Sequence, residues 1–427
     1  MGPILIALLS FALRLWNLGL PKKPVFDEIY YVDGARDYLL HGVELTKQSS
    51  EFIVHPPVGK WGIALGIRLF GNNEFGWRFS VAVAGALTIY LIGRIAYQLF
   101  QSKPLATLAS LLMALDGLNL VHSRTALLDL FLTLFLLLAV YAWLREHYWR
   151  SGLWFGLALG SKWSAIYFLL VFAALALYRD RHRLQTWSRL LPKRAIQFGF
   201  LPVTVYVLTW TGWFLSSQGW DRNWATSDSS WKFIPAPMRS LWHYHAEMLN
   251  FHTSLTEKHS YQANPWSWLI MGRPTSFFYA SPKTCGPQNC AQEVLALGTP
   301  FLWWSATLAL ATVIGFWITA KYRGESDRVA TLILAGVAAG YLPWFLFQKR
   351  TVFSFYAIVF EPFLILALVY CANKYLGQRP WEQNKKLIVA LVLLAIAWNF
   401  WYFLPLFNGS VIPYDQWHNR MWLPSWI

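Results

Sequence analysis

The sequence has few charged residues and only three cysteines. Charged residues make up 13% of the 427 residues, whereas apolar residues make up 56% and aromatic residues 18%. This scarcity of charge argues against the two or three soluble domains that the length alone would suggest. Apolar runs recur from end to end instead. We therefore predict one all-α polytopic membrane domain over residues 1–427.

Roughly eleven apolar runs are long enough to cross a hydrocarbon core of about 30 Å. We expect the spans near residues 3–19, 79–100, 105–121, 126–144, 152–163, 164–178, 195–215, 299–320, 329–347, 357–373 and 387–405. The fifth and sixth share one stretch that is broken at residues 160–162, so the count is open there. No small-residue cleavage site follows the first run, which is therefore expected to be a retained span.

Acidic residues are outnumbered, because 36 Lys and Arg against 21 Asp and Glu give a formal net charge of +15. These cations lie in short loops between apolar runs, as in the cytoplasmic loops of membrane proteins, so nucleic acid is not an expected partner. We expect the basic connections to be cytoplasmic: residues 145–150, 179–194, 321–328 and 374–386. The outward parts are then a first outer loop (20–78), a second outer loop (216–298) and a C-terminal tail (406–427).

The sequence has no Walker motif and no dinucleotide-binding fingerprint. The polar bulk faces outward, where nucleotide sugars are not expected. An enzyme of this topology must take an activated substrate from the membrane itself. A transporter is the alternative, but it does not need two large outer loops, and the internal repeats that many transporters have are not seen in this sequence.

Two adjacent carboxylates, Asp27 and Glu28, follow the first span and lie among aromatic residues. Adjacent residues on a helix or a strand point in different directions, so the two cannot do the same job. One can face a reacting group while the other orients a neighbouring group that assists the reaction. The alternative is a pair of solvated loop acids beside Lys22 and Lys23.

The first outer loop contains two further segments of interest. Residues 29–42 can form a short amphipathic helix on the membrane surface. Residues 55–60 (HPPVGK) form a turn that opens a second such helix, which continues to Phe70. The prolines restrict the turn, and the glycine permits the close approach that a ligand would need. An ordinary interfacial loop with surface helices is the alternative.

Several cations lie where the outward turns meet the spans. Four of them have no acidic neighbour in the sequence: Arg78, Lys162, Lys349 and Arg350. A cation at membrane depth costs about 2.5–3.5 kcal/mol on insertion scales, so it usually has a partner. Cations gathered at one face suit a lipid phosphate, although anchoring to lipid headgroups is the alternative. For Arg124, an ion pair with Asp129 is the structural alternative to a role in a site.

The second outer loop is rich in histidine. His245, His252 and His259 recur at seven-residue intervals, which would align them on one continuous helix. Ligands two helical turns apart are too distant to share one ion, so we expect hydrogen-bonding or substrate-facing histidines and no metal. In the same loop, Cys285 and Cys290 are expected to form a disulfide in an oxidising compartment.

The C-terminal tail is rich in tryptophan. Tryptophan favours the membrane interface, so we expect the tail to anchor there. A cap over an outer cavity is the alternative.

Together these motifs resemble those of the protein O-mannosyltransferase family. In order, they are the Asp27–Glu28 pair, His55-Pro-Pro-Val-Gly-Lys60, Ser123-Arg-Thr-Ala-Leu-Leu-Asp129, Gly160-Ser-Lys-Trp163, the run from Tyr244-His245 to Pro265-Trp266, and Arg273-Pro274. The resemblance covers nearly the whole chain, and the tryptophan-rich ending looks like the bacterial branch. Eukaryotic members insert a β-trefoil module into the second outer loop, which is too short here to hold one.

The resemblance implies a GT-C fold in a bacterial plasma membrane, with the active site facing outward. It implies polyprenyl-phosphate mannose as the donor, Ser or Thr hydroxyls of translocated proteins as acceptors, inversion at the anomeric carbon, and no cofactor. Asp27 would be the general base, and Glu28 would position the acceptor or the loop. The four cations Arg78, Lys162, Lys349 and Arg350 would stabilise the leaving phosphate. Other matched residues would line the donor or acceptor site: His55, Lys60, Arg124, Asp129, His245 and Arg273.

Two rival functions stay open at this point. Lipid A aminoarabinose transferases share the GT-C architecture and an outer-loop acid but modify a lipid, whereas the run from Tyr244 to Pro274 favours the protein-modifying family. A transporter of lipid-linked sugars is the rival from another class. Membrane lipid and the secretion translocon are further candidate partners. The sequence does not specify the acceptor proteins, the polyprenol length or the oligomeric state.

Overall fold

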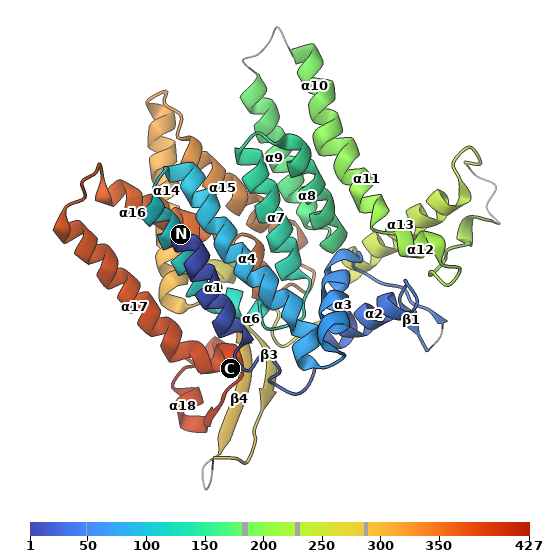
Figure 1. Ribbon diagram of the computed structural model, residues 1–427, viewed down its shortest axis with the longest axis horizontal. Coiled ribbons are helices and arrows are strands. Elements are labelled where there is room, and N and C mark those ends of the chain that lie inside the picture. The colour runs from blue at the N-terminus through green and yellow to red at the C-terminus, as the bar shows by residue number, and fades with distance from the viewer. Residues whose placement is uncertain (48, 182–186, 227–230, 286–288) are drawn as a thin grey trace.

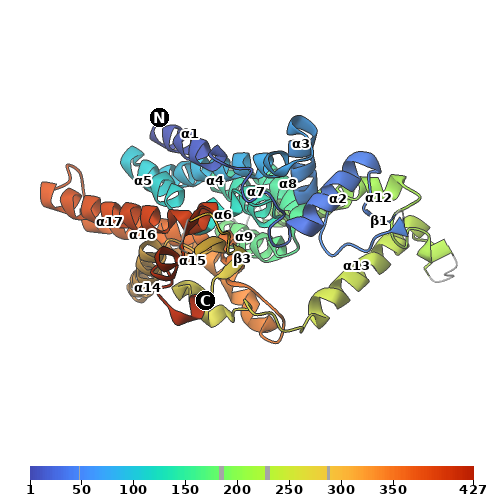
Figure 2. The same cartoon turned by 90° about the horizontal axis from the view of Figure 1, so that it is seen from below.

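The computed structural model shows a mostly helical protein built around one bundle of long helices (Figure 1). It describes residues 1–47, 49–181, 187–226, 231–285 and 289–427. Short helices and strands project from one end of the bundle, the lower end in Figure 1. Seen from that end the molecule is elongated, with α17 (Gln383–Asn408) extending on one side and α13 (Ala236–Ser254) on the other (Figure 2).

The bundle also contains further helices of varied length. They are α1 (Gly2–Leu15), α4 (Glu74–Phe100), α5 (Lys103–Ala114), α6 (Gly117–His122), α7 (Asp129–Leu144), α8 (Tyr148–Ser161), α9 (Ala165–Asp180), α10 (Trp187–Ala195), α11 (Leu201–Leu208), α14 (Pro300–Tyr322), α15 (Arg328–Tyr341) and α16 (Glu361–Leu376). A π-helical turn over Ile196–Phe200 joins α10 to α11, and a 3₁₀ segment over Leu342–Phe347 extends α15.

These helices fit a polytopic membrane protein. Within the described residues, four segments are long and apolar enough to cross a bilayer: α4, α14, Arg328–Phe347 and α17. The apolar helices α1, α5 and α7 are shorter. The break expected at residues 160–162 is present, because Lys162 is extended and separates α8 from α9. The total of about eleven spans stays a prediction.

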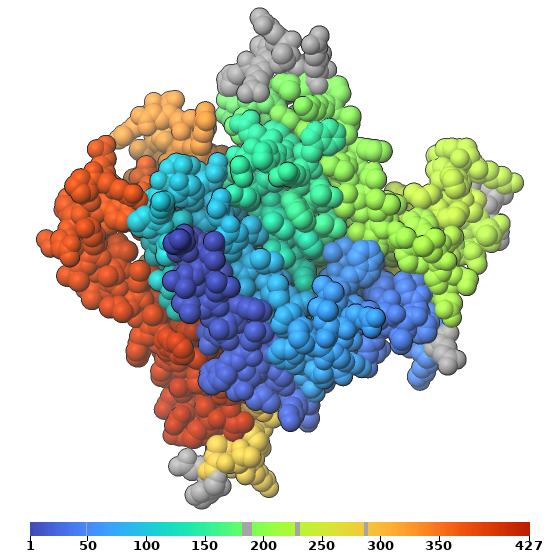
Figure 3. Space-filling model, viewed as in Figure 1, coloured from blue at the N-terminus to red at the C-terminus, as the bar shows by residue number. Residues whose placement is uncertain are grey.

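The core of the bundle lies around α7. This helix is apolar all round and is buried along nearly its whole length, as a helix in the middle of a bundle must be. α1 packs on α4 and α5 and lies on the face of the molecule that Figure 3 shows. The helices α9, α14 and α16, which the basic connections follow, end toward the upper part of Figure 1, opposite the outer loops. Residues 182–186 of the first of these connections lie outside the described residues.

The first outer loop forms the two expected helices, α2 (Glu28–Leu40) and α3 (Val58–Phe70), and a short hairpin of β1 (Leu45–Thr46) and β2 (Ser49–Ser50). The second follows α12 (Thr211–Leu215) and contributes α13 and the antiparallel strands β3 (Thr275–Ala280) and β4 (Cys290–Ala296). The C-terminal tail adds β5 (Val411–Pro413) to β4, followed by α18 (Tyr414–His418). The disulfide Cys285–Cys290 lies beyond β3, at the start of β4.

The histidine spacing in the second outer loop predicted one continuous helix, and this is wrong for His259. α13 carries His245 and His252 but ends at Ser254. Leu255 is extended, and its carbonyl accepts a hydrogen bond from the Thr351 backbone N–H at 3.2 Å. The chain therefore turns to pair with the segment before α16, and His259 lies beyond that turn.

Candidate active site

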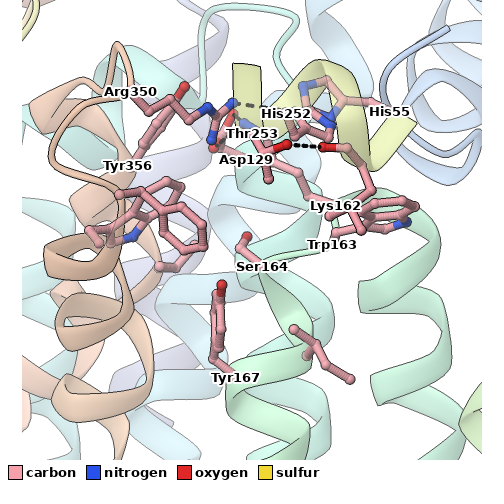
Figure 4. Close-up of a pocket in the computed structure, with 15 residues that line it drawn as sticks. His55, Asp129, Lys162, Trp163, Ser164, Tyr167, His252, Thr253, Arg350 and Tyr356 are labelled. Carbon is pink, nitrogen blue, oxygen red and sulfur yellow. Dashed lines mark hydrogen bonds and ion pairs between the residues drawn. The ribbon is translucent and has the colours of Figure 1, made fainter. Parts of the chain in front are cut away.

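A cavity of about 240 Å³ lies between the bundle and the outer loops (Figure 4). One part of its lining is polar and aromatic. These side chains come from the first outer loop, α7, the α8–α9 break, α13 and the segment before α16: His55, Asp129, Lys162, Trp163, His252, Arg350 and Tyr356. The remainder of the lining is mainly apolar and includes Leu249, Trp344 and Phe347. A pocket with a few convergent polar groups in an apolar wall is the usual form of a ligand site.

Lys162 and Asp129 form the ion pair at the centre of this cavity. The Lys162 ammonium donates to both carboxylate oxygens of Asp129 at 2.9 Å, and its nitrogen lies 4.9 Å from the centre of the Tyr356 ring. The extended backbone at the helix break directs Lys162 toward Asp129, which lies in the first turn of α7. Asp129 thus pairs with Lys162, and the described residues show no Arg124–Asp129 pair, which was the structural alternative for Arg124.

Arg350 is the cavity cation that pairs with no carboxylate in the described part of the chain. Its Nη2 donates to Nδ1 of His252 at 3.3 Å, while its buried Nε has no hydrogen-bond partner. His252 Nε2 donates in turn to the Val54 carbonyl at 2.7 Å. Both ring nitrogens of His252 are thus engaged, and burial together with the nearby Arg350 lowers the pKa of His252 to about 4. The neutral His252 therefore accepts a hydrogen bond from the Arg350 guanidinium, whose Nε–H is left without an acceptor.

Asp27 lies beside the cavity and next to the Lys162–Asp129 pair. The Tyr31 hydroxyl donates to Asp27 Oδ2 at 3.4 Å, and the Tyr31 ring lies 6.1 Å from that of His55, which lines the cavity. Burial raises the pKa of Asp27 to about 6, and the neighbouring Asp129 adds to this, while Lys162 and the Tyr31 hydrogen bond act against it. A carboxyl group whose pKa lies near the working pH is suited to general-base chemistry.

Glu28 has a different environment from its neighbour. It is fully buried, and Arg78 donates to Oε1 through Nε and to Oε2 through Nη2, both at 2.8 Å. The backbone N–H groups of Ala126 and Val25 donate to the same two oxygens at 2.7 and 2.8 Å. Glu28 thus ties the first outer loop to α4 and to the segment before α7.

Arg78 was expected to hold the donor phosphate, and the structure corrects this. Besides Glu28, its guanidinium donates to the carbonyls of Leu18, Pro21 and Lys23 at 3.3, 3.1 and 3.0 Å. Its five N–H groups are therefore all used within the protein. No donor of Arg78 is left for a phosphate.

Other predicted site residues stabilise the surroundings of the cavity. Arg124 donates to the carbonyls of Arg14, Trp16 and Asn17 at the end of α1. Lys60 forms a buried ion pair with Glu44 at 2.6 Å. Both lie outside the cavity lining, and both are engaged by partners within the protein.

The last three predicted residues also lie outside the lining. His245 engages the Tyr206 hydroxyl through Nε2 and the Leu241 carbonyl through Nδ1, and its ring stacks on Trp163 at 5.6 Å. Arg273 donates to backbone carbonyls, including that of Ile427, so it holds the C-terminal tail. Lys349 is exposed beside Arg350.

Sequence reasoning did not assign a role to Tyr31 or Tyr356, although one contacts Asp27 and the other contacts Lys162. The only sequence feature that could have indicated them is that Tyr31 lies near Asp27 in the sequence and Tyr356 lies near Arg350. The described residues contain no group of three or more His, Cys, Asp or Glu side chains that could hold a metal ion.

The sequence matches two family models that together cover most of the chain. Residues 4–217 match the model described as dolichyl-phosphate-mannose-protein mannosyltransferase. Residues 237–426 match the C-terminal four-transmembrane region of protein O-mannosyltransferase.

Similar proteins have been described in several bacteria. A polyprenol-phosphate-mannose–protein mannosyltransferase of Mycolicibacterium smegmatis is 34% identical, with 99% of this chain and 92% of that protein covered. One of the same description from Corynebacterium glutamicum is 30% identical, with 94% and 88% covered.

Solved structures share the fold. A chain of the S. cerevisiae Pmt1-Pmt2 protein O-mannosyltransferase complex bound to the sugar donor superimposes with a TM-score of 0.83 at 15% identity, over 100% of this chain and 92% of that chain. ArnT from Cupriavidus metallidurans bound to undecaprenyl phosphate gives 0.56 at 17% identity, over 91% and 63%. The architecture is therefore the GT-C fold of a multi-pass membrane protein. With both family models and relatives at this level of identity in agreement, the chain belongs to the protein O-mannosyltransferase family, whose members are membrane glycosyltransferases.

Proposed function

We propose that the protein transfers mannose from polyprenyl-phosphate mannose to Ser or Thr hydroxyls of translocated proteins. The family supports the reaction, and the bacterial relatives carry names that state this donor and a protein acceptor. The observation that carries the proposal is the cavity with its surroundings. Arg350, which pairs with no carboxylate among the described residues, lines the cavity, and Asp27, a carboxyl group with a raised pKa, lies beside it near the Lys162–Asp129 pair.

The donor phosphate would bind at Arg350. Its buried Nε lacks a partner, and hydrogen bonds between a guanidinium and a phosphate are among the strongest in proteins. The leaving group departs as an anion, so a cation already in place stabilises the charge that develops there. Lys162 also lines the cavity and would add positive charge there while remaining paired with Asp129.

Asp27 would accept the proton of the acceptor hydroxyl. The hydroxyl oxygen then attacks the anomeric carbon from the face opposite the phosphate, a new C–O bond forms, and the bond to the phosphate oxygen breaks. Direct displacement of this kind inverts the anomeric centre. The proton stays on Asp27 and is released to water, and polyprenyl phosphate leaves.

The site would face the outside of a bacterial plasma membrane. The basic connections lie at the opposite end of the bundle, and cytoplasmic loops carry the excess of Lys and Arg. An outward site would meet acceptor chains as they emerge from the membrane, so the secretion translocon is a candidate partner.

Mannose transfer by detergent-purified protein tests the function, with radiolabelled polyprenyl-phosphate mannose as donor and a Ser/Thr-rich peptide as acceptor. Label should appear on the peptide.

The Arg350→Gln variant should bind the donor about 10- to 100-fold more weakly, since a hydrogen bond to a charged group contributes about 1.5–3 kcal/mol. The neighbouring Lys349→Gln, which removes an exposed charge, is the matched control and should bind donor as the wild type does. Label found only on lipid would instead indicate a lipid-modifying transferase, and unchanged donor affinity in Arg350→Gln would remove Arg350 from the phosphate site.

A further inference from the structure

Phe26, the residue before Asp27, has an unusual backbone conformation. Its φ angle is +49°, in the left-handed region that bulky residues rarely adopt. Such conformations persist only where the surrounding structure holds them in place, and they concentrate at functional sites. The residue two positions along, Glu28, is locked by Arg78. The backbone on both sides of Asp27 is therefore constrained.

The contacts of Phe26 explain what holds it. Its backbone N–H donates to the Phe277 carbonyl on β3 at 3.1 Å, and its ring stacks on the Phe277 ring with centroids 4.8 Å apart. Phe353 and Phe355 contact the Phe26 ring edge-on, with centroids 5.8 and 5.4 Å from its centroid. Phe277 and Phe355 are almost fully buried. These four phenylalanines, which we call the Phe26 cluster, join the first outer loop to the second and to the segment before α16.

That last segment is also the wall of the cavity. Phe353 and Phe355 lie between Arg350 and Tyr356, both of which line the cavity, and the Phe355 ring packs against Tyr356 at 4.8 Å. The cluster therefore connects Phe26, the residue before Asp27, to Tyr356 in the cavity lining through consecutive ring contacts. Rings in such edge-on and stacked arrangements attract one another beyond the area they bury.

We propose that Phe26 is a positioning residue for the transfer reaction, which fixes Asp27 relative to the wall that carries Arg350 and Tyr356. The proposal rests on the function proposed above. Phe26 itself touches no substrate. It acts by holding the base in reach of the acceptor hydroxyl once the donor is bound, and by keeping water from the carboxyl group.

The Phe26→Leu variant tests this, because leucine keeps apolar bulk but loses the stacked ring. We expect kcat to fall about 10- to 100-fold, since a displacement of about 1 Å can cost this much in rate. Donor affinity should stay within about threefold of the wild type. The pH at which Asp27 is half-protonated should fall from about 6 toward its ordinary value of about 4, because water reaches the carboxyl group.

Carbodiimide labelling read by mass spectrometry measures that midpoint without using the reaction, since the reagent modifies protonated carboxyl groups. The control is Phe135→Leu, which removes a similar ring that stacks on Trp154 at 6.1 Å within the bundle. It should change neither kcat nor the midpoint. If Phe26→Leu does not fold, Phe277→Leu breaks the same stack from β3 and should give the same result.

An unchanged kcat and an unchanged labelling midpoint in Phe26→Leu would overturn the proposal, as would a loss of activity that lies only in a raised KM for the donor. A double variant of Phe26 and Phe277 should lose little more activity than either single variant, because both remove one stack. A wild-type protein that transfers no mannose would refute the proposed function instead, and the labelling midpoint would still decide whether Phe26 shapes the environment of Asp27.

Discussion

Asp27 and Glu28 are neighbours in sequence but lie in two opposite environments. Glu28 is fully buried, and its oxygens accept four hydrogen bonds, two of them from Arg78. Asp27 lies beside the cavity, where one long hydrogen bond from Tyr31 reaches it and burial raises its pKa to about 6. The comparison shows how one loop can use the same chemical group twice. A carboxylate with all its partners supplied by the protein stabilises structure, whereas one that burial leaves short of partners is ready to take a proton.

Among the variants that test this difference between Asp27 and Glu28, Asp27→Asn should have the largest effect on the rate of transfer. Asparagine keeps the shape but cannot accept a proton, so kcat should fall about 10²- to 10⁴-fold, the usual contribution of a general base. Thermal unfolding and donor binding should match the wild type, because the side chain makes one weak contact. Transfer at the wild-type rate would show that Asp27 is not the base.

The Glu28→Gln variant should act on stability instead. It leaves Arg78 as a buried cation without a counter-charge, which typically costs about 3–5 kcal/mol. A large drop in the midpoint of thermal unfolding in detergent is the expected result. Glu382→Gln is the control. It breaks the ion pair between Glu382 and Lys385 on the surface, and such exposed pairs contribute little to stability. A Glu28→Gln protein with wild-type stability and no transfer activity would place Glu28 in the chemistry rather than in the support of the loop.

The pH dependence should show a smaller and graded effect. The free base form of Asp27 is required, so kcat/KM should rise with pH up to about 6 and level off above it. At one pH unit below that midpoint it should be about tenfold lower. Buffered transfer assays between about pH 4.5 and 8 measure the profile. A profile that is flat across pH 6 would mean that a group other than Asp27 limits the rate.

Local patterns in the sequence predicted much of the framework. Apolar runs located the helices of the bundle, and tandem proline followed by Val-Gly-Lys located the start of α3 at Val58. The excess of Lys and Arg in alternate loops predicted which loops lie together, because that excess follows from the membrane and needs no tertiary contact. The order of the motifs was also sufficient to suggest the family.

Pairing between charges could not be predicted in this way. Arg78 and Glu28 are 50 positions apart, and Lys162 and Asp129 are 33 apart, so no local pattern connects either pair. The sequence therefore placed four cations in the phosphate site, whereas in the described part of the structure Arg350 is the cation of the cavity lining with a buried donor that lacks a partner.

The sequence by itself determined the class of this protein, a helical membrane enzyme of one family, because burial in lipid and short-range motifs leave local signatures. Only the tertiary structure decided which carboxylate is free to act and which cation is free to bind. That choice depends on long-range hydrogen bonds, and buried charges form them with whichever partners the folded chain brings within about 3 Å.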